Sequence, residues 1–287
     1  MKILKPLIGI AIILLLSGAI ALGGTQGSAS IGPYSVFLLC ASVGFLLHWA
    51  VFVPSFMFQT EHYFDLTGGI SYIATVALAY VALPQMDIRG QLLCLLVAVW
   101  AARLATFLFI RVKKAGKDRR FDEIKKNFFR FAFTWTMGGG WVFITMAAAL
   151  AAITSDAQKP LGLFAYTGLA IWILGFGIEV IADNQKTKFR ANPDNAEKFI
   201  TSGLWSRSRH PNYFGEIILW IGVALIAFPV LSGWQYVTLI SPVFVMLLLI
   251  KVSGVKLLEE SARKRWGSDP DYQEYVKTTP VLVPKLS

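Results

Sequence analysis

Polar side chains that could bind a charged ligand stand at the start of an apolar run in the segment GLWSRSRHPNYFGEIILWIG, residues 203–222. They include cations, an amide and a carboxylate, at Arg207, Arg209, His210, Asn212 and Glu216. Pro211 stiffens the turn into the next helix. The amino end of a helix favours an anion. Arg209, His210 and this helix end together therefore predict a phosphate-binding site.

The alternative explanation for this motif is a set of side chains that snorkel to a membrane surface. Snorkelling accounts for lysine and arginine at a membrane edge. It does not account for Asn212 and Glu216, which are four residues apart, share a helix face and run into the apolar segment. We therefore favour the ligand site, and we include Tyr213 among its candidate residues.

A second polar group lies in FGIEVIADNQKTKFRANPDNAEKFITSGLW, residues 176–205. Glu179, Asp183, Lys186 and Arg190 are spaced so that they share one face of a helix. Carboxylates accept hydrogen bonds from vicinal hydroxyls, as in ribose recognition, and a guanidinium can form a forked contact with phosphate. A ladder of i,i+4 salt bridges explains the same spacing equally well.

Two further segments are basic. Residues 111–131, RVKKAGKDRRFDEIKKNFFRF, are typical of a cytoplasmic loop that lies on lipid headgroups, and extra contacts to an anionic cofactor are the alternative. The tail from residue 257 contains Trp266, Tyr272 and Tyr275, which could stack on an adenine or lie at the membrane interface. Its specific turn residues predict a folded lid.

Long apolar runs must position these groups. The chain of 287 residues is 55% hydrophobic and only 15% charged, whereas soluble domains carry about 25% charged residues. Roughly 20 apolar residues cross a bilayer as a helix. We expect spans near residues 6–24, 34–57, 66–84, 90–110, 131–153, 161–181, 214–229 and 235–253. The short seventh span and the eighth, which contains Pro242, could instead be re-entrant. The predicted fold is an all-α bundle of seven or eight transmembrane helices in one membrane domain, residues 1–287.

The distribution of positive charge predicts the orientation. Of the 27 Lys and Arg residues, 24 fall in four segments that lie on one side of an eight-span topology. Lysine and arginine favour the cytoplasmic side, so both termini are expected in the cytoplasm. The net charge of +10 is then explained by the orientation of the protein in the membrane and by attraction of an anionic ligand. Nucleic-acid binding is the less favoured explanation.

The first segment, MKILKPLIGIAIILLLSGAIALGG, resembles a signal peptide, with a basic start and an apolar centre. Because its apolar run is long for a signal peptide, we favour a retained span for residues 1–33. The later topology is the same in both cases.

Other kinds of site find no support in the sequence. Cys40 and Cys94 lack the spacing of a zinc site and are expected to be buried packing residues, and the three histidines are far apart, so we expect no metal. The glycine motifs of a Rossmann site and of a P-loop are absent. Gly138–Gly140 lies within a span, where it permits close helix approach.

The segments SRHPNYFGEIILWIG, IEVIADNQKTKFR and RWGSDPDYQEYVKTTPVLVP together resemble bacterial steroid 5-alpha-reductase-like membrane proteins, relatives of the 3-oxo-5-alpha-steroid 4-dehydrogenases. The resemblance covers roughly residues 35–287, the expected reductase-like core. It implies a helical membrane protein of the bacterial inner membrane that binds NADPH in a cavity open to the cytoplasm. In that family, hydride passes from the nicotinamide to the β-carbon of a conjugated enone.

The resemblance also carries over cofactor contacts. The matching positions are Asp183, Arg190, Asn212, Glu216 and Tyr275. Lys198 and Lys256 stand where the steroid enzymes have arginine, so they keep the charge and lose the forked contact. Glu179 stands where those enzymes have asparagine.

The substrate end departs from the family pattern. Val51 and Phe52 replace a Gln-Glu pair before PSF, and Trp100 aligns roughly with a tyrosine that polarises the substrate carbonyl. Replacement proton donors could come from QTEHYFD, at Glu61 or Tyr63, with His48 nearby in the chain. An ordinary helix-end acid is an equally good explanation of Glu61.

Three hypotheses follow. The leading one is an NADPH-dependent reductase of a lipophilic enone, with membrane lipid and a lipophilic substrate as partners. The second is a methyltransferase of the isoprenylcysteine carboxyl methyltransferase type, which shares an RHP motif and uses S-adenosylmethionine. The third is a transporter or scaffold that has lost catalysis.

Overall fold

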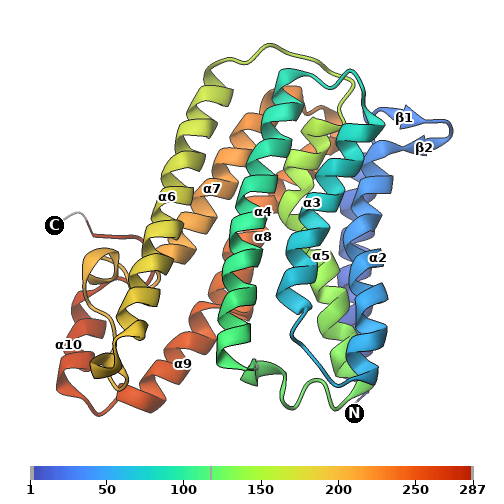
Figure 1. Cartoon of the computed structure of the whole chain (residues 1–287). Helices are drawn as coiled ribbons and strands as arrows, with labels where there is room; N and C mark the ends of the chain where they lie inside the picture. The colour runs from blue at the N-terminus through green and yellow to red at the C-terminus, as the bar shows by residue number, and fades with distance from the viewer. Residues whose placement is uncertain (1–2, 117, 286–287) are drawn as a thin grey trace. The chain divides into compact units, whose positions relative to one another are not determined.

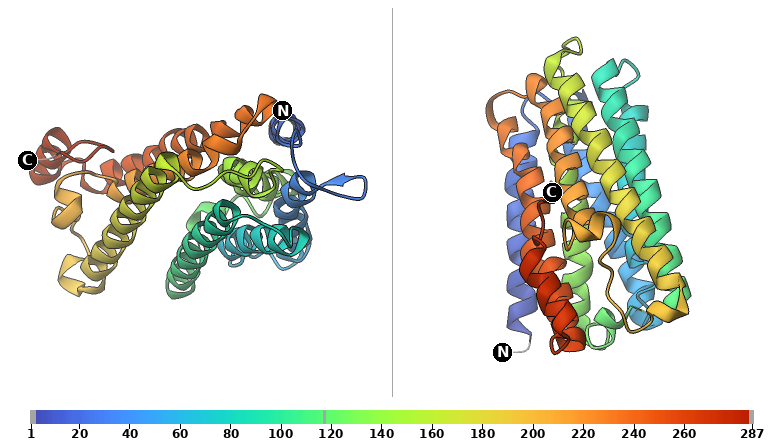
Figure 2. Two further views of the ribbon diagram at one scale, coloured as in Figure 1. Left: turned by 90° about the horizontal axis from the view of Figure 1, so that it is seen from above. Right: turned by 90° about the vertical axis from the view of Figure 1, so that its left-hand side faces the viewer.

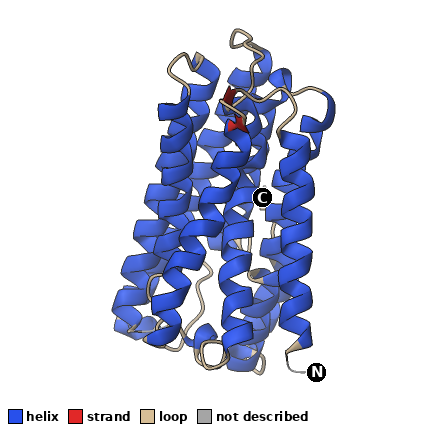
Figure 3. Cartoon of the chain, turned by 90° about the vertical axis from the view of Figure 1, so that its right-hand side faces the viewer, coloured by secondary structure: helices blue, strands red, loops and turns tan. Residues whose placement is uncertain are grey.

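Apolar runs fold into long helices throughout the part of the chain that the computed structural model describes, residues 3–116 and 118–285. Within those ranges, eight helical stretches are long and apolar enough to cross a membrane. The only strands described, β1 (Ser30–Ile31) and β2 (Tyr34–Ser35), form one short antiparallel hairpin (Figure 3). The protein is therefore an all-α polytopic membrane protein, as the sequence predicts. Lys2 and Lys117, which belong to the basic segments, lie outside the described residues.

The chain packs as two compact units, Met1–Ala165 with Ile226–Ser241, and Tyr166–Leu225 with Pro242–Ser287. The first unit contains five long helices, labelled in part in Figure 1: α1 (Leu4–Gly24), α2 (Val36–Met57), α3 (Phe64–Ala82), α4 (Ile88–Ala115) and α5 (Phe128–Ile153). Side chains cap several of their amino ends. The Asp87 carboxylate accepts from the backbone N–H of Gly90 at 2.8 Å, and the Asn127 side chain accepts from Arg130 at 3.0 Å.

Helix α5 is the central helix of the first unit. It contacts α1, α2, α3 and α4 (Figure 2), and nearly every residue from Gly138 to Ile153 is buried. The glycine run predicted to allow close approach does so. A Cβ at Gly139 would lie 2.9 Å from the Cα of Phe45 on α2, which is too close for any other residue to fit without a shift.

The second unit consists of α6 (Leu163–Ala191), α7 (Pro211–Ala227), α8 (Ile240–Leu247), α9 (Val255–Trp266) and α10 (Pro270–Thr278). The first residues of α6, the last residues of α7 and the first two of α8 belong to the first unit. Helix α6 continues ten residues beyond the predicted end at residue 181, and this extension carries Asp183, Lys186 and Arg190.

The eighth apolar segment is not one regular helix. It begins as the 3₁₀ turn Gly233–Leu239, continues as α8 and ends in the π-helical turn Leu248–Val252. Pro242 lies in the first turn of α8, where its missing N–H costs no helix bond. The predicted eighth span is confirmed as a candidate span, Gly233–Trp266, although its helix is irregular.

The basic segment between α4 and α5 is a loop, as the sequence predicts. Its described residues form the 3₁₀ turn Arg119–Phe121 followed by turns, so no amphipathic helix forms there. Cys40 and Cys94 are both buried and unpaired, as expected of packing residues.

Candidate functional site

The predicted RHP turn lies in the second unit, and the tail of the chain holds it in place. The hydroxyl of Ser208 accepts from the backbone N–H of His210 at 3.2 Å and donates to the carbonyl of Leu282 at 2.8 Å. The backbone N–H of Arg209 donates to the carbonyl of Pro280 at 2.9 Å. The predicted folding of the tail is thus confirmed, and the tail fixes the backbone of the turn.

One carboxylate, that of Glu259, contacts both Arg209 and His210 of the turn. Arg209 Nη1 lies 2.7 Å from Glu259 Oε2, and His210 Nε2 lies 2.8 Å from Glu259 Oε1. The side chains of Arg209 and His210 are only 11% and 6% exposed. Sequence reasoning missed Glu259, because nothing in its spacing distinguishes it from Glu260 beside it in the chain.

Burial sets the protonation of His210. Desolvation lowers the pKa of this histidine below its ordinary value, the hydrogen bond and charge of Glu259 partly oppose the shift, and the positive charges of Lys186 and Arg209 add to it. A neutral His210 whose Nε2–H donates to Glu259 presents a lone pair at Nδ1. Such a group accepts a hydrogen bond from a ligand, and its predicted role in binding phosphate stays a prediction.

A close crossing of α6 and α7 brings the two predicted polar helix faces together. A Cβ at Gly175 would lie 2.6 Å from the carbonyl oxygen of Gly215, so the two backbones are in contact. Next to the crossing, Asn212 Nδ2 donates to Asp183 Oδ1 at 3.1 Å. Glu179, on α6, is 2% exposed.

A third carboxylate, Glu216 on α7, is also buried, with 7% exposed. The contact of Asp183 with Asn212 agrees with the predicted helix faces, and Glu179 and Glu216 are buried on the same two helices. Buried carboxylates at the end of an apolar helix are costly and usually mark a functional site.

Two further side chains border the turn. The ring of Tyr213 stacks on the imidazole of His210, with centroids 5.6 Å apart and planes 7° from parallel. The ammonium of Lys186 lies 4.4 Å from the ring centroid of Trp205, which is close enough for a cation–π contact. The turn therefore has an aromatic border and a second positive charge.

Three buried polar atoms of this turn have no hydrogen-bond partner among the described residues: Arg209 Nε, His210 Nδ1 and Asn212 Oδ1. Buried polar atoms are almost always hydrogen-bonded, and leaving one without a partner costs about 1–3 kcal/mol. Arg209 Nε is a donor, whereas Asn212 Oδ1 and the neutral His210 Nδ1 are acceptors. A ligand that offers one acceptor and two donors would satisfy all three.

Other predicted cofactor residues have contacts of their own. The guanidinium of Arg190 lies 5.6 Å from the ring centroid of Trp266. Lys198 and Lys256 are exposed. Trp266, Tyr272 and Tyr275 each have ring contacts with Phe199, so they pack into an aromatic cluster.

Tyr275 also anchors the tail. Its hydroxyl donates to the carbonyl of Trp205 at 2.6 Å, and burial raises the pKa of its phenol. The side chain thus has a structural partner in this conformation.

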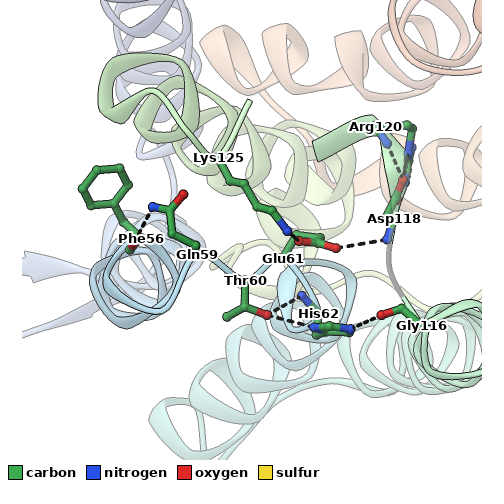
Figure 4. A network of polar contacts seen from close by, with 9 residues as sticks. All are labelled: Phe56, Gln59, Thr60, Glu61, His62, Gly116, Asp118, Arg120 and Lys125. Carbon is green, nitrogen blue, oxygen red and sulfur yellow. Dashed lines mark hydrogen bonds and ion pairs between the residues drawn. The ribbon is translucent and has the colours of Figure 1, made fainter. Parts of the chain in front are cut away.

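The two candidate proton donors lie in the first unit, in the α2–α3 loop. Glu61 is 3% exposed, and its carboxylate accepts from Lys125 Nζ at 2.5 Å and from the backbone N–H of Asp118 at 3.0 Å (Figure 4). Next to it, His62 Nε2 lies 2.7 Å from the carbonyl oxygen of Gly116. These contacts tie two loops together, and they favour a structural role for Glu61. Tyr63 is 52% exposed.

Val51, Phe52 and Trp100, which stand where the steroid enzymes have polar substrate-binding groups, take part in apolar and aromatic packing. Phe52 belongs to a buried cluster with Phe131 and Trp135, and Val51 packs against it. The ring of Trp100 contacts Tyr72 with centroids 5.1 Å apart. Catalytic roles for Glu61 and Tyr63 stay predictions.

The chain is a helical membrane protein with buried polar groups at an RHP turn, and it is similar in sequence to steroid 5-alpha-reductases. Residues 51–279 match the family described as "Protein of unknown function (DUF1295)", and the chain belongs to this family.

Curated relatives match over shorter stretches. The chain is 25% identical over 120 residues to 3-oxo-5-alpha-steroid 4-dehydrogenase 1 of Mus musculus, which is 42% of each chain. It is 40% identical over 72 residues to Delta(14)-sterol reductase ERG24A of Gibberella zeae, covering 21% of this chain and 14% of the relative. It is also 31% identical over 84 residues to a probable O-methyltransferase, ustE, of Ustilaginoidea virens, covering 29% and 30%.

These matches leave much of each relative uncovered. The chain spans 42%, 27% and 40% of the length of the steroid dehydrogenases from Mus musculus, Bos taurus and Rattus norvegicus. The family assignment rests on the match over residues 51–279, and activity and substrate are treated as proposals below.

Proposed function

We propose that this protein is a membrane oxidoreductase that reduces a carbon–carbon double bond of a lipophilic enone with NADPH. The observation that carries the proposal is the set of three buried, unpartnered polar atoms on the RHP turn, at Arg209, His210 and Asn212. Relatives named as steroid dehydrogenases and sterol reductases support it.

The polar groups of the turn fit parts of a dinucleotide. Arg209 Nε would donate to a phosphate or carbonyl oxygen. Asn212 Oδ1 and His210 Nδ1 would accept from hydroxyl or amide N–H groups, which ribose and nicotinamide both provide. Asp183 holds the amide of Asn212 so that Oδ1 stays available. When bound, the nicotinamide supplies hydride to the β-carbon of the enone.

The residues of the chain supply orientation. Glu259 holds Arg209 and His210 in fixed positions before any ligand arrives, and preorganised groups lose less entropy on binding. The α-carbon of the reduced enone takes a proton to complete the reaction. Glu61 and Tyr63 are the proposed donors, and the ion pair with Lys125 makes Glu61 the weaker of the two.

The second candidate function is a methyltransferase that uses S-adenosylmethionine. The similarity to a probable O-methyltransferase favours it. The ammonium, carboxylate and ribose of that cofactor would also satisfy the three unpartnered atoms. NADPH carries phosphate groups and S-adenosylmethionine does not, so measuring which of the two cofactors binds distinguishes the reductase from the methyltransferase.

The test is calorimetry on the full chain in a non-ionic detergent with NADPH, NADH and S-adenosylmethionine. We expect NADPH to bind more tightly than NADH, and Arg209→Ala to weaken NADPH binding roughly 10- to 100-fold. Arg207→Ala is the matched control, because Arg207 is exposed two residues earlier. Binding of S-adenosylmethionine without NADPH would refute the reductase.

Turnover is tested separately with a panel of conjugated enones and NADPH deuterated at the transferable position. The proposal requires deuterium at the β-carbon of the product. We further propose that both termini face the cytoplasm of a bacterial inner membrane, which membrane-impermeant labelling of cysteines added near each terminus would test.

A further inference from the structure

A buried histidine lies inside the first unit, where three of its helices meet. His48 on α2 is 1% exposed, and α2, α3 and α5 pack against one another (Figure 1). The imidazole has edge-on contacts with Phe64 on α3 and Trp135 on α5, with ring centroids 6.0 Å and 5.9 Å apart. An ionisable side chain within an apolar span is costly to bury, and such residues usually mark a functional site. The chemistry of the two ring nitrogens therefore decides what this position can bind.

The two ring nitrogens of His48 have different surroundings. Nδ1 lies 2.7 Å from the carbonyl oxygen of Gly44 and 3.5 Å from the hydroxyl of Ser71, which itself donates to the carbonyl of Thr67 at 2.7 Å. Because a carbonyl oxygen only accepts, Nδ1 carries the proton. Burial among apolar groups favours the neutral ring. Nε2 is then an acceptor, and within the described part of the chain it has no hydrogen-bond partner.

An indole N–H beside the histidine is also unsatisfied. Trp135 is 0% exposed, and its Nε1 is one of the buried atoms without a hydrogen-bond partner among the described residues. The ring packs in the buried aromatic cluster with Phe52, Phe121 and Phe131. An indole N–H only donates, whereas the neutral Nε2 of His48 only accepts. Two neighbouring rings thus leave one donor and one acceptor unpaired in apolar surroundings, which is costly.

A glycine on α5 shows where the unpaired nitrogen of the histidine faces. A Cβ at Gly138 would lie 2.7 Å from His48 Nε2 and 2.6 Å from its Cδ2, so this edge of the imidazole contacts α5. Gly138 follows Trp135 by three residues, so the two positions share one helix face. The unpaired nitrogen of His48 therefore faces the same stretch of α5 that carries the unpaired indole.

We propose that this junction of α2, α3 and α5 binds the hydroxyl group of a lipophilic alcohol. The hydroxyl donates its proton to His48 Nε2 and accepts a hydrogen bond from Trp135 Nε1. A ketone or an ether only accepts, so either of these groups leaves the histidine nitrogen unpaired. The aromatic rings around the two atoms suit an apolar molecule. Neither NADPH nor the RHP turn takes part, so this site is independent of the proposed function.

Binding of two alcohols of different shape tests the site. Scintillation-proximity assays measure tritiated cholesterol, and separately tritiated 1-dodecanol, on the full chain in non-ionic detergent without NADPH. The methyl ether of each alcohol is the matched competitor. We expect each alcohol to compete roughly 10-fold better than its ether. Equal competition by alcohol and ether in both assays, or no binding of either alcohol, would overturn the inference.

Three aromatic variants separate the acceptor, the donor and the packing. His48→Phe removes the acceptor, so it should lower the affinity for alcohol roughly 10-fold and leave that for ether little changed. Trp135→Phe removes the donor and should weaken both alike. Trp49→Phe is the matched control for loss of an indole, because Trp49 Nε1 already donates to Thr136 Oγ1 at 3.0 Å, and it should change neither affinity. Equal weakening of alcohol and ether by a folded His48→Phe protein would count against the site.

Nitrogen-15 resonances of the imidazoles give a readout that packing alone does not move. The chain has three histidines, so the spectra of His62→Gln and His210→Gln assign the remaining signals to His48. We expect an unprotonated Nε2 whose resonance moves upfield when 1-dodecanol is added, because it then accepts a hydrogen bond, and which stays in place with the methyl ether. A hydrogen-bonded Nε2 that is present without alcohol and unchanged by it would identify a buried water as the occupant and overturn the inference.

Discussion

Glu259 is the counter-ion of the largely buried Arg209 and the hydrogen-bond acceptor of the buried His210, so removing its charge tests the site. The substitution Glu259→Gln keeps the size of the side chain and removes its negative charge. Arg209, 11% exposed, then has no carboxylate partner, and His210 loses the acceptor that fixes its ring. Both side chains stay largely buried, where an unpaired charge or hydrogen-bond donor is unfavourable.

The expected loss of stability lies between two limits. Removing one partner of a fully buried ion pair costs about 3–5 kcal/mol, and exposed pairs contribute about 0.2–1 kcal/mol. Because the Glu259 side chain is 22% exposed, we expect a loss of about 2 kcal/mol. This corresponds to a fall of about 4–8 °C in the unfolding temperature.

The assay is thermal unfolding in detergent, with Glu260→Gln as the matched control. Glu260 is the next residue on the same helix and is exposed, so its variant changes the net charge equally and should shift stability by less than about 0.5 kcal/mol. A double-mutant cycle with Arg209→Gln then isolates the coupling between the two charges. Equal unfolding temperatures for the two glutamine variants would refute the argument that Glu259 holds the turn together.

Three other predictions use the same unfolding assay. Gly175→Ala should lower the stability by about 1–3 kcal/mol, because the added Cβ would lie 2.6 Å from the carbonyl oxygen of Gly215. Gly177→Ala is the control and should be neutral or stabilising, because there is open space around Gly177. Similar losses of stability in the two variants would exclude a close crossing. Burial lowers the pKa of His210. The stabilising contribution of the neutral side chain is therefore present above the ordinary histidine pKa and is lost as the pH falls through the lowered value. The wild-type protein should lose more stability than His210→Gln between about pH 7 and pH 5, and parallel curves of stability against pH would contradict this. Gln59 has φ of 53°, so Gln59→Gly should relieve strain and stabilise the protein by roughly 0.5–1 kcal/mol, and a destabilised variant would argue against this backbone conformation.

The polar residues that converge on the site were largely predictable. Glu179, Asp183, Asn212 and Glu216 were recognised because charged and amide groups are costly inside apolar helices, and helical spacing placed each pair on one face. The α6–α7 crossing then turned these two faces toward each other. Close backbone contact at Gly175 and Gly215 permits this, and no spacing rule identifies that pair.

The structure separated residues that the sequence grouped together. Arg190 was grouped with Asp183 on one helix face, and it lies against Trp266, because α6 continues two turns beyond Asp183. Glu61 was considered as a proton donor, and its carboxylate is bound by Lys125 from a loop 64 residues later. Such pairings depend on where loops return, and local patterns contain no information about them.

The amino-acid sequence by itself determined that this protein is a polytopic helical membrane protein with a polar site at its RHP turn. Apolar length and the cost of burying charge are local properties, so they can be read residue by residue. Only the tertiary structure decided that Glu259, and not its neighbour Glu260, pairs with Arg209 and His210. That choice depends on how α9 packs against the turn, since rotating a helix by one residue directs a different side chain inward.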